Sequence, residues 1–442
     1  MNTFSPAAAA PLLIAWILVS CSDDRRTAVE EPCRTCPTMD HATHLTHTAT
    51  AATASPARAT DLGALGARIA GAPAFAKIVV PAGVYREPTI VITKPVELVG
   101  QPGAILDGEG ARTVLLVLAD DVTVTGFTIR NTGSSQVAER AGIKVSDARR
   151  CLIARNQFHN TAFGVYLEKT SGCVVRENTL HGSGATQSQN GNGIHAWNSE
   201  HVTVLENDIM GHRDGIYFEF VTHGHVSNNR SVANSRYGLH FMFSNDSEYQ
   251  GNTYRENGNG VAVMYSSRVA MRRNTFERNL GGAAYGLLLK DINESTIVDN
   301  TFNTNTVALH LEGSSRNTVT NNVFAQNGVA LRILANAQDN VIEQNDFKAN
   351  TFDVATNSRA SYSTLRGNFW DRYRGYDLDH DGVGDVPHAP VTLFGLFVEQ
   401  TPAALVLLRS PFVGLLDLAE RAIPSLTPAL RDEAPRLQAR GT

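Results

Sequence analysis

Short runs in which apolar and polar residues alternate recur along the middle of the chain, each opened by Gly or Ala. The run at Gly215 reads Gly-Ile-Tyr-Phe, and the run at Gly238 reads Gly-Leu-His-Phe. Equivalent runs begin at Gly164, Gly193, Gly260, Gly286, Ala308 and Ala330. A period of two predicts a β-strand with one buried face, and runs this short between frequent turns do not predict helices. The pattern therefore indicates an all-β protein.

A second repeat, an Asn followed two positions later by an apolar residue, is phased with these strands. It occurs at Asn156, Asn178, Asn207, Asn252, Asn274, Asn300, Asn322, Asn345 and Asn368, with a degenerate copy at Asn229. The ten positions are 22, 29, 22, 23, 22, 26, 22, 23 and 23 residues apart, and the two long gaps read as loop insertions at 182–192 and 281–284. A leucine-rich repeat needs an L-x-x-L-x-L consensus that is missing from this sequence. We therefore predict a right-handed parallel β-helix over residues 61–376, with 22–23 residues per coil.

Stacked coils place equivalent residues in columns with a spacing of roughly 4.8 Å. An Asn column can bond along the stack and satisfy the backbone of the turns, so we assign it a structural role. Cys151 and Cys173 both lie five residues before their Asn and therefore meet in neighbouring coils. They form either a disulfide or a buried reduced pair.

The two ends of the chain differ from the repeats. Residues 1–21 contain a short apolar run that ends at Ser20-Cys21, which predicts an export signal with a lipobox and a lipidated Cys21, although residues 1–11 carry no Lys or Arg. Residues 22–60 are rich in Thr, Ala, Pro and His and predict a disordered tether. Residues 391–442 contain apolar segments at 403–408 and 413–422, which predict amphipathic helices that dock on a membrane partner, cap the open end of the β-helix, or do both.

The charge of the chain argues against nucleic-acid binding. Charged residues make up 18% of the chain and the net charge is −5, so there is no strong positive field to collect nucleic acid.

Alternation assigns one set of side chains to the outer face of the repeat strands. One outward column contains His195, His240 and His310, and the next contains Glu219, Met242 and Met264. Two of the six Met residues are thus neighbours in one column. Thioether and imidazole ligands together suit copper, and thioether favours Cu(I). These six residues predict a copper site, and the alternative is a mixed outer face that contacts a partner.

Two further clusters have metal-ligand chemistry. In the tether, Cu(I) or zinc ligands are available at Cys33, Cys36, Met39 and His41. A Cys33–Cys36 disulfide in a polar linker is the alternative. Within the segment 377–390, carboxylates occupy positions 1, 3, 5 and 9 of a calcium-type loop, at Asp377, Asp379, Asp381 and Asp385. Position 12 is His388 rather than Glu, so the choice lies between a structural Ca²⁺ and a tight turn whose Asp side chains cap their own backbone.

Three segments resemble the NosD family. The segment Gly367–Asp385, with Asn368-Phe369-Trp370-Asp371 and the Asp-rich loop, is similar to the signature of that family. The segments from Ile78 to Asn131 and from Pro402 to Pro428 are similar as well. The Asp-rich part is shared by wider β-helix relatives, so the C-terminal segment makes the resemblance specific. The lipobox and the Cys/Met/His tether depart from the family pattern.

The resemblance implies a non-enzymatic periplasmic role in denitrification. A protein of this family would be a metallochaperone that delivers copper for the copper–sulfur site of nitrous oxide reductase. Its partners would be an inner-membrane ABC transporter, a small copper lipoprotein that donates copper, and nitrous oxide reductase itself. Lipidation at Cys21 would anchor this chain to a membrane in the periplasm.

A different class of β-helix supplies the rival interpretation, a lyase or epimerase of acidic polysaccharides. Such enzymes need paired carboxylates, or an Asp with a base, on one outward face. The available groups are Glu168, Asp214, Glu219, Lys290 and Glu312. Glu219 and Glu312 are four coils apart, roughly 19 Å, and we expect no Tyr or Lys base opposite an Asp in a neighbouring coil. A scaffold without a ligand of its own is the third possibility.

Overall fold

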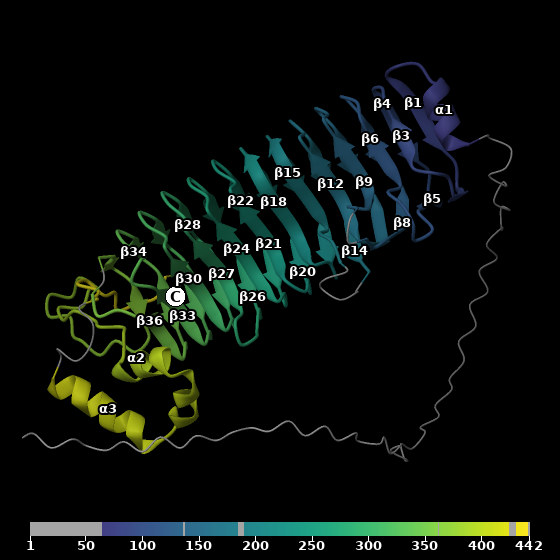
Figure 1. Ribbon diagram of the computed structural model, residues 1–442. Helices are drawn as coiled ribbons and strands as arrows, with labels where there is room; N and C mark the ends of the chain where they lie inside the picture. Colours follow the sequence, from purple (N-terminus) through teal and green to yellow (C-terminus); the bar gives the residue numbers. More distant parts are fainter. Residues whose placement is uncertain (1–63, 136–137, 184–189, 361, 424–429, 441–442) are drawn as a thin grey trace, which may run out of the picture. The chain divides into compact units, whose positions relative to one another are not determined.

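The computed structural model describes residues 64–440 except 136–137, 184–189, 361 and 424–429. The predicted signal and tether, including Cys21, Cys33, Cys36, Met39 and His41, lie outside the described residues. Three parallel sheets, which we call A, B and C, run side by side through the solenoid, and successive strands of the chain go to A, B and C in turn (Figure 1). This arrangement confirms the predicted parallel β-helix.

Each sheet is built from one short strand per coil. Sheet A consists of β1 (Ala76–Val80), β4 (Val96–Gly100), β7 (Thr123–Thr125), β10 (Leu152–Ala154), β13 (Val174–Arg176), β16 (Thr203–Leu205), β19 (His225–Ser227), β22 (Glu248–Gln250), β25 (Ala270–Arg272), β28 (Thr296–Val298), β31 (Thr318–Thr320), β34 (Val341–Glu343) and β37 (Thr364–Arg366). Sheet B consists of β2 (Gly83–Tyr85), β5 (Ala104–Asp107), β8 (Thr128–Gly133), β11 (Gln157–Thr161), β14 (Thr179–Gly182), β17 (Asp208–Met210), β20 (Arg230–Val232), β23 (Thr253–Arg255), β26 (Thr275–Glu277), β29 (Thr301–Asn303), β32 (Val323–Ala325), β35 (Asp346–Lys348) and β38 (Phe369–Trp370). Sheet C consists of β3 (Ile90–Ile92), β6 (Leu115–Val117), β9 (Ala141–Ser146), β12 (Phe163–Glu168), β15 (Ile194–Glu200), β18 (Asp214–Thr222), β21 (Tyr237–Met242), β24 (Asn259–Met264), β27 (Tyr285–Lys290), β30 (Val307–Glu312), β33 (Val329–Ile333) and β36 (Phe352–Thr356).

The predicted Asn column forms a continuous ladder at the bend between sheets A and B. Asn178 illustrates it: the side-chain amide donates to Asn207 Oδ1 at 3.0 Å and to the Ile153 carbonyl at 3.0 Å. Its backbone N–H also donates to Asn207 Oδ1, at 3.0 Å. Burying the ladder is favourable because it pairs polar groups of the bend that would otherwise be left without partners.

The apolar residue two positions after each Asn fills the core. The side chains of Phe276, Phe302, Phe324, Phe347 and Trp370 are buried and stack along the solenoid with ring centroids 4.2–4.9 Å apart. Elsewhere in the core, Cys151 and Cys173 are joined by a disulfide, with a Cα–Cα distance of 4.5 Å. The structure thus selects one of the two states that the sequence left open for this pair.

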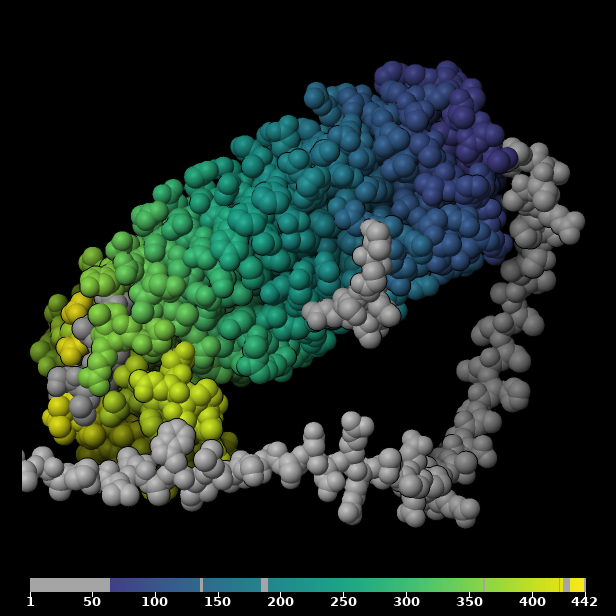
Figure 2. All heavy atoms as spheres, in the orientation of Figure 1, coloured from purple at the N-terminus to yellow at the C-terminus, as the bar shows by residue number. Residues whose placement is uncertain are grey.

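Helices lie at both ends of the described residues. The helix α1 (Leu65–Gly71) precedes the first coil, and α2 (Leu393–Gln400), η2 (Pro402–Leu407) and α3 (Pro411–Ala422) follow the last one. The 413–422 segment is helical as predicted, whereas 403–408 lies mainly in a 3₁₀ helix and α2 was not predicted. Figures 1 and 2 show these C-terminal helices, in yellow-green, against the last coils. In the part of the chain that the structure describes, every helix is too short or too polar to cross a membrane.

The last described residues return to close the end of the solenoid. Asp432 is fully buried and accepts hydrogen bonds from the backbone N–H of Gly367 and Asn368 at 2.9 Å each. It also accepts from the Asn368 amide at 2.9 Å and from Trp370 Nε1 at 3.0 Å. The final member of the Asn ladder therefore meets a carboxylate where a further coil would have supplied another Asn.

Candidate functional site

The register of sheet C aligns the residues that the sequence placed on its outward face. Residues at equivalent positions pair across consecutive strands of the sheet. One column runs Tyr166, His195, Tyr217, His240, Ala262, Leu288, His310 and Arg332. The second column runs Glu168, Trp197, Glu219, Met242, Met264, Lys290 and Glu312. His240 and Met242 thus lie on the same face of β21, with Met264 directly beside Met242 on β24.

The imidazoles of the first column are buried although they face away from the core. His195, His240 and His310 are 7%, 5% and 4% exposed. Aromatic rings cover them: the His195 ring centroid lies 4.6 Å from Tyr166 and 4.7 Å from Tyr217. The ring of His240 stacks on Tyr217 at 4.6 Å with an interplanar angle of 10°. Alternation predicts on which side of the strand a residue lies, but it does not predict whether neighbouring side chains cover it.

Nitrogen atoms in this aromatic stack lack hydrogen-bond partners among the described residues. They are both ring nitrogens of His240 and Nε2 of His195. The nearest charge to His240 is Asp214, whose Oδ2 lies 3.8 Å from Nδ1. Buried polar atoms are normally satisfied, so these nitrogens are free to bind a ligand.

Two half-buried thioethers lie beside His240. Tyr217 Oη donates to Met242 Sδ at 3.5 Å, and Met242 pairs in register with Glu219 on one side and Met264 on the other. We call His240, Met242, Met264 and Glu219 the sheet-C cluster. It combines a buried imidazole, two thioethers and one carboxylate, and this set contains the soft ligands that Cu(I) prefers.

An exposed aromatic ladder borders the sheet-C cluster. Phe220, Phe243 and Tyr265 each follow one residue of the second column, and their rings stack with centroids 5.0 and 5.1 Å apart. Their exposed fractions are 48%, 38% and 41%. An apolar surface of this kind beside the thioethers suits contact with another protein.

The structure does not bring the other predicted copper ligands into this cluster. His195 is two coils from His240, with the Tyr217 ring between them. His310 is three coils beyond His240, roughly 14 Å at the coil spacing, and its Nε2 lies 3.7 Å from Glu312 Oε2. The copper prediction therefore depends on the thioethers and on His240.

Burial keeps the imidazoles of His195 and His310 neutral near pH 7. It lowers the pKa of His195 to about 3 and that of His310 to about 4. For Asp214, burial acts to raise the pKa, but the hydrogen-bonded Arg236 guanidinium and the nearby His240 imidazole outweigh it and leave the pKa below its ordinary value. Neutral imidazole is the form that binds metal ions.

Asp214 also corrects one expectation. No Tyr or Lys base was expected opposite an Asp in a neighbouring coil, yet Asp214 pairs in register with Tyr237 on the next strand. The prediction was wrong because Asp214 and Tyr237 both precede the Gly of their repeats, so their pairing did not follow from the two columns that come after the Gly. Asp214 is fully buried and forms an ion pair with Arg236.

In the Asp-rich loop, both states that the sequence left open have support. The carboxylates of Asp377, Asp379 and Asp381 have oxygens within 4.8 Å of one another, and they form the one such group of His, Cys, Asp or Glu found in the described residues. The same carboxylates cap the loop, since Asp377 accepts from Gly382 N at 3.0 Å and Asp381 from Val383 N at 2.7 Å. Asp385 lies apart from the three and accepts from Leu378 N at 2.7 Å.

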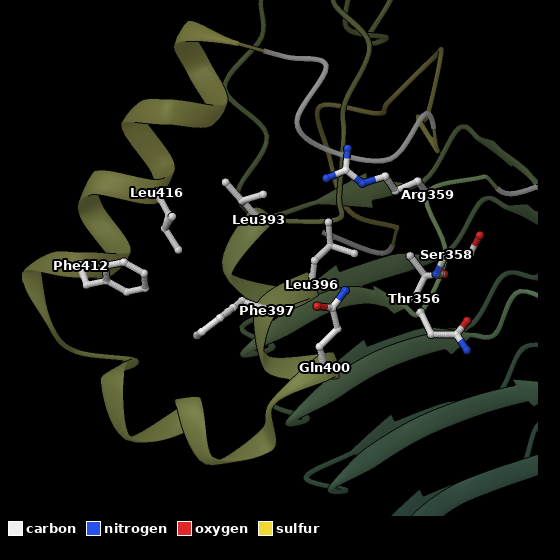
Figure 3. A pocket seen from close by; sticks show the side chains of 10 residues that line it. Thr356, Ser358, Arg359, Leu393, Leu396, Phe397, Gln400, Phe412 and Leu416 are labelled. Carbon is white, nitrogen blue, oxygen red and sulfur yellow. Dashed lines mark hydrogen bonds between the residues drawn. The ribbon is translucent and has the colours of Figure 1, made fainter. Parts of the chain in front are cut away.

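A cavity of about 220 Å³ lies between the C-terminal helices and the segment after β36. Figure 3 shows Leu393, Leu396 and Phe397 of α2 near Phe412 and Leu416 of α3, with Arg359 at the solenoid side. Around it, apolar side chains face solvent: Val406 is 86% exposed, and Leu415 and Leu418 are each 64% exposed. The C-terminal segment therefore presents apolar side chains to solvent in addition to covering the last coils.

Comparison with known proteins gives two family matches. Residues 183–375 match a family described as "Periplasmic copper-binding protein (NosD)", and residues 82–252 match a protein family of unknown function, DUF1565. A "Probable ABC transporter binding protein NosD" of Pseudomonas aeruginosa is 30% identical over 401 residues, which cover 79% of this chain and 85% of the relative. The protein of the same name from Stutzerimonas stutzeri is 30% identical over 379 residues, covering 81% and 86%.

Solved structures share the fold at low identity. The A-module of mannuronan C-5 epimerase AlgE6 from Azotobacter vinelandii has a TM-score of 0.51 at 18% identity, and the match covers 71% of this chain and 93% of that one. The catalytic unit of a GH87 α-1,3-glucanase from Streptomyces thermodiastaticus has a TM-score of 0.53 at 15% identity, covering 73% and 67%. Both are enzymes, but similarity at this level extends to the β-helix alone.

Proposed function

Because this chain belongs to the NosD family, we propose that it is a periplasmic, non-enzymatic protein that binds Cu(I) and delivers it for assembly of the copper–sulfur site of nitrous oxide reductase. The observation that carries the proposal is the sheet-C cluster. Its imidazole has two buried nitrogens without partners, and its two thioethers lie side by side at the surface. A soft, largely neutral ligand set binds Cu(I) in preference to harder divalent ions.

The arrangement suits transfer as well as binding. The thioethers of Met242 and Met264 are half-buried, so an incoming ligand can reach the ion from the solvent side. His240 lies behind them, with its ring stacked on that of Tyr217. An ion held by few ligands at a surface can pass to a partner by stepwise ligand exchange, and the exposed rings of Phe220, Phe243 and Tyr265 offer that partner a contact.

The C-terminal segment supports an ABC transporter in the inner membrane as one partner. Glu399 of α2 is anchored to Arg332 of sheet C at 3.0 Å, so the helices have a fixed place on the solenoid. Their exposed Val406, Leu415 and Leu418 would pack against the periplasmic face of the transporter. The proposal also includes a small copper lipoprotein as donor, nitrous oxide reductase as recipient, a lipid anchor at Cys21 and copper ligands in the tether. We add a structural Ca²⁺ in the Asp-rich loop, because three carboxylates converge there.

The copper proposal is tested by titrating the full chain with Cu(I) in competition with bathocuproine disulfonate. We expect M242L/M264L to weaken binding at the sheet-C cluster by at least roughly tenfold, the equivalent of about 1.4 kcal/mol. The matched control is M271L, which removes a thioether that is fully buried in the core. Equal affinity of M242L/M264L and M271L would contradict the proposal.

A polysaccharide lyase or epimerase is the second candidate, and the pairing of Asp214 with Tyr237 and His240 favours it. Tyr237 is partly exposed and could act as a base, whereas Asp214 is neutralised by Arg236. This candidate predicts that the chain depolymerises or epimerises acidic polysaccharides and that Y237F abolishes the activity. This candidate would be excluded by an assay on alginate and polygalacturonate that finds no change in either polymer.

A further inference from the structure

A second column of imidazole and thioether side chains lies on the outer face of sheet B. His159 on β11 pairs in register with His181 on β14, and His181 pairs with Met210 on β17. All three side chains are half-buried, and the two imidazole rings meet edge to face with centroids 5.5 Å apart. Three consecutive coils thus present two nitrogen ligands and one sulfur ligand in one line.

The placement of methionine makes this column unusual. Among the described residues Met271 lies in the core, where an apolar side chain is expected, and Met210, Met242 and Met264 face outward. Each outward group of Met lies next to a His: Met242 is two residues from His240, and Met210 is the register partner of His181. Packing alone gives no reason to place a thioether on a half-exposed face beside an imidazole.

The electrostatic surroundings favour a soft monovalent ion over a hard divalent one. The column continues to Arg130 below His159 and to Val232 above Met210, and neither residue is a carboxylate. The Arg130 guanidinium forms an ion pair with Asp107, with Nη2 2.9 Å from Oδ2. A set of imidazole and thioether ligands without a carboxylate matches Cu(I) rather than calcium or magnesium.

We propose that His159, His181 and Met210 form a second Cu(I) site, on a different face of the solenoid from the sheet-C cluster. Two imidazole nitrogens bracket an ion when they are roughly 4 Å apart, given metal–nitrogen distances of about 2 Å. Half-exposed rings in adjacent coils reach that separation by rotation about their side-chain torsions. Met210 supplies the third ligand from the next coil. The site adds an ion to the proposed function and does not depend on the sheet-C cluster being occupied.

The test counts bound Cu(I) in the full chain by competition with bathocuproine disulfonate. We expect H159A/H181A/M210L to bind one equivalent less than the unmodified chain, and M210L alone to weaken that site by at least roughly tenfold. The matched control is H201A/H223A, which removes another stacked imidazole pair, with ring centroids 4.8 Å apart, that lies outside the column. Circular dichroism melting of each variant reports whether the fold is kept, and M210L provides the answer if the triple variant does not fold.

The outcomes separate this proposal from the proposed function. Loss of one equivalent in the sheet-B variant, with the control unchanged, supports the second site. Unchanged stoichiometry and affinity in the sheet-B variants would overturn it, whatever M242L/M264L does. If M242L/M264L leaves Cu(I) binding unchanged while the sheet-B variant loses an equivalent, the result contradicts the copper site at the sheet-C cluster and supports the second site.

Discussion

At the scale of single residues, the bends between strands contain more buried chemistry than the repeat pattern indicates. His212 is an example that the sequence did not single out. It is fully buried at the start of a second Asn ladder, where its backbone N–H donates to Asn234 Oδ1 at 3.0 Å. The column continues through Asn257, Asn279, Asn305, Asn327 and Asn350. Asn is thus the residue that this position would hold if the ladder were one member longer.

Burial lowers the pKa of His212 to about 4. An unfolded chain takes up a proton at this residue below about pH 6.5, whereas the folded chain does so only below about pH 4, so acidification across this window favours unfolding. H212N removes that contribution and also extends the ladder. We expect the stability lost on acidification to fall by up to about 1.4 kcal/mol per pH unit in this window.

Urea unfolding of H212N and the unmodified chain at about pH 7, about pH 5.5 and about pH 4.5 measures this difference. Identical dependence on pH in the two proteins would show that the folded state accepts the proton at His212 without cost.

At the scale of the element, each bend is stabilised by one amide that serves two coils. Asn274 accepts from Asn252 N at 3.0 Å and from the Asn252 amide at 3.0 Å. It donates to Asn300 Oδ1 at 3.0 Å and to the Tyr249 carbonyl at 3.1 Å. Replacing one Asn therefore removes partners from two neighbouring coils as well as from its own.

We expect N274A to destabilise the protein by about 3 kcal/mol, because buried backbone groups lose their partners at about 1–3 kcal/mol each. The matched control is N336A, since Asn336 is exposed and accepts a single bond from Gly313 N at 3.0 Å. The midpoints of urea unfolding compare the two variants. Equal shifts would mean that a ladder Asn stabilises the protein no more than an exposed Asn does.

The sequence predicted the elements better than it predicted the site. The spacing of the Asn residues set the coils and their register, and from these Met242 and Met264 followed as neighbours. Tyr217 followed from the predicted column, but the contact of Tyr237 with His240, at 4.8 Å between ring centroids, was not predictable because Tyr237 precedes the Gly that marked the repeat. The column of His159, His181 and Met210 was missed for a related reason: it lies on the strand after the Asn, where the repeat pattern marks the inward apolar residue and not the outward residue that follows it.

At the scale of the whole molecule, a solenoid needs a closed end. The role of Asp432 could not be read from the sequence, because its bonds to Asn368 and Trp370 join residues more than sixty positions apart outside any repeat. Resemblance to a family predicted that the C-terminal segment is functional. The structure divides that segment into helices that lie on sheet C and a final stretch that covers the last coil.

We expect D432A to destabilise the last coils by about 3 kcal/mol or more, because four buried donors lose one acceptor. Since an open sheet end pairs with other chains, the variant should also form larger assemblies. Trp fluorescence during urea unfolding and size-exclusion chromatography measure the two effects. The neighbouring exposed Glu433 supplies the control E433A, and a D432A protein that matches it in both measurements would leave the closing role without support.

The Asn ladder has a consequence for how such proteins change over evolutionary time. A duplication or deletion that runs from one ladder Asn to the next adds or removes one whole coil, and every later residue keeps its sheet and its face. The sheet-C cluster and the C-terminal helices can therefore be moved apart or together in steps of about 4.8 Å without remaking either one. Members of the family would then differ in length by whole coils. The distance between the sheet-C cluster and the C-terminal helices would differ among them by whole numbers of coil spacings.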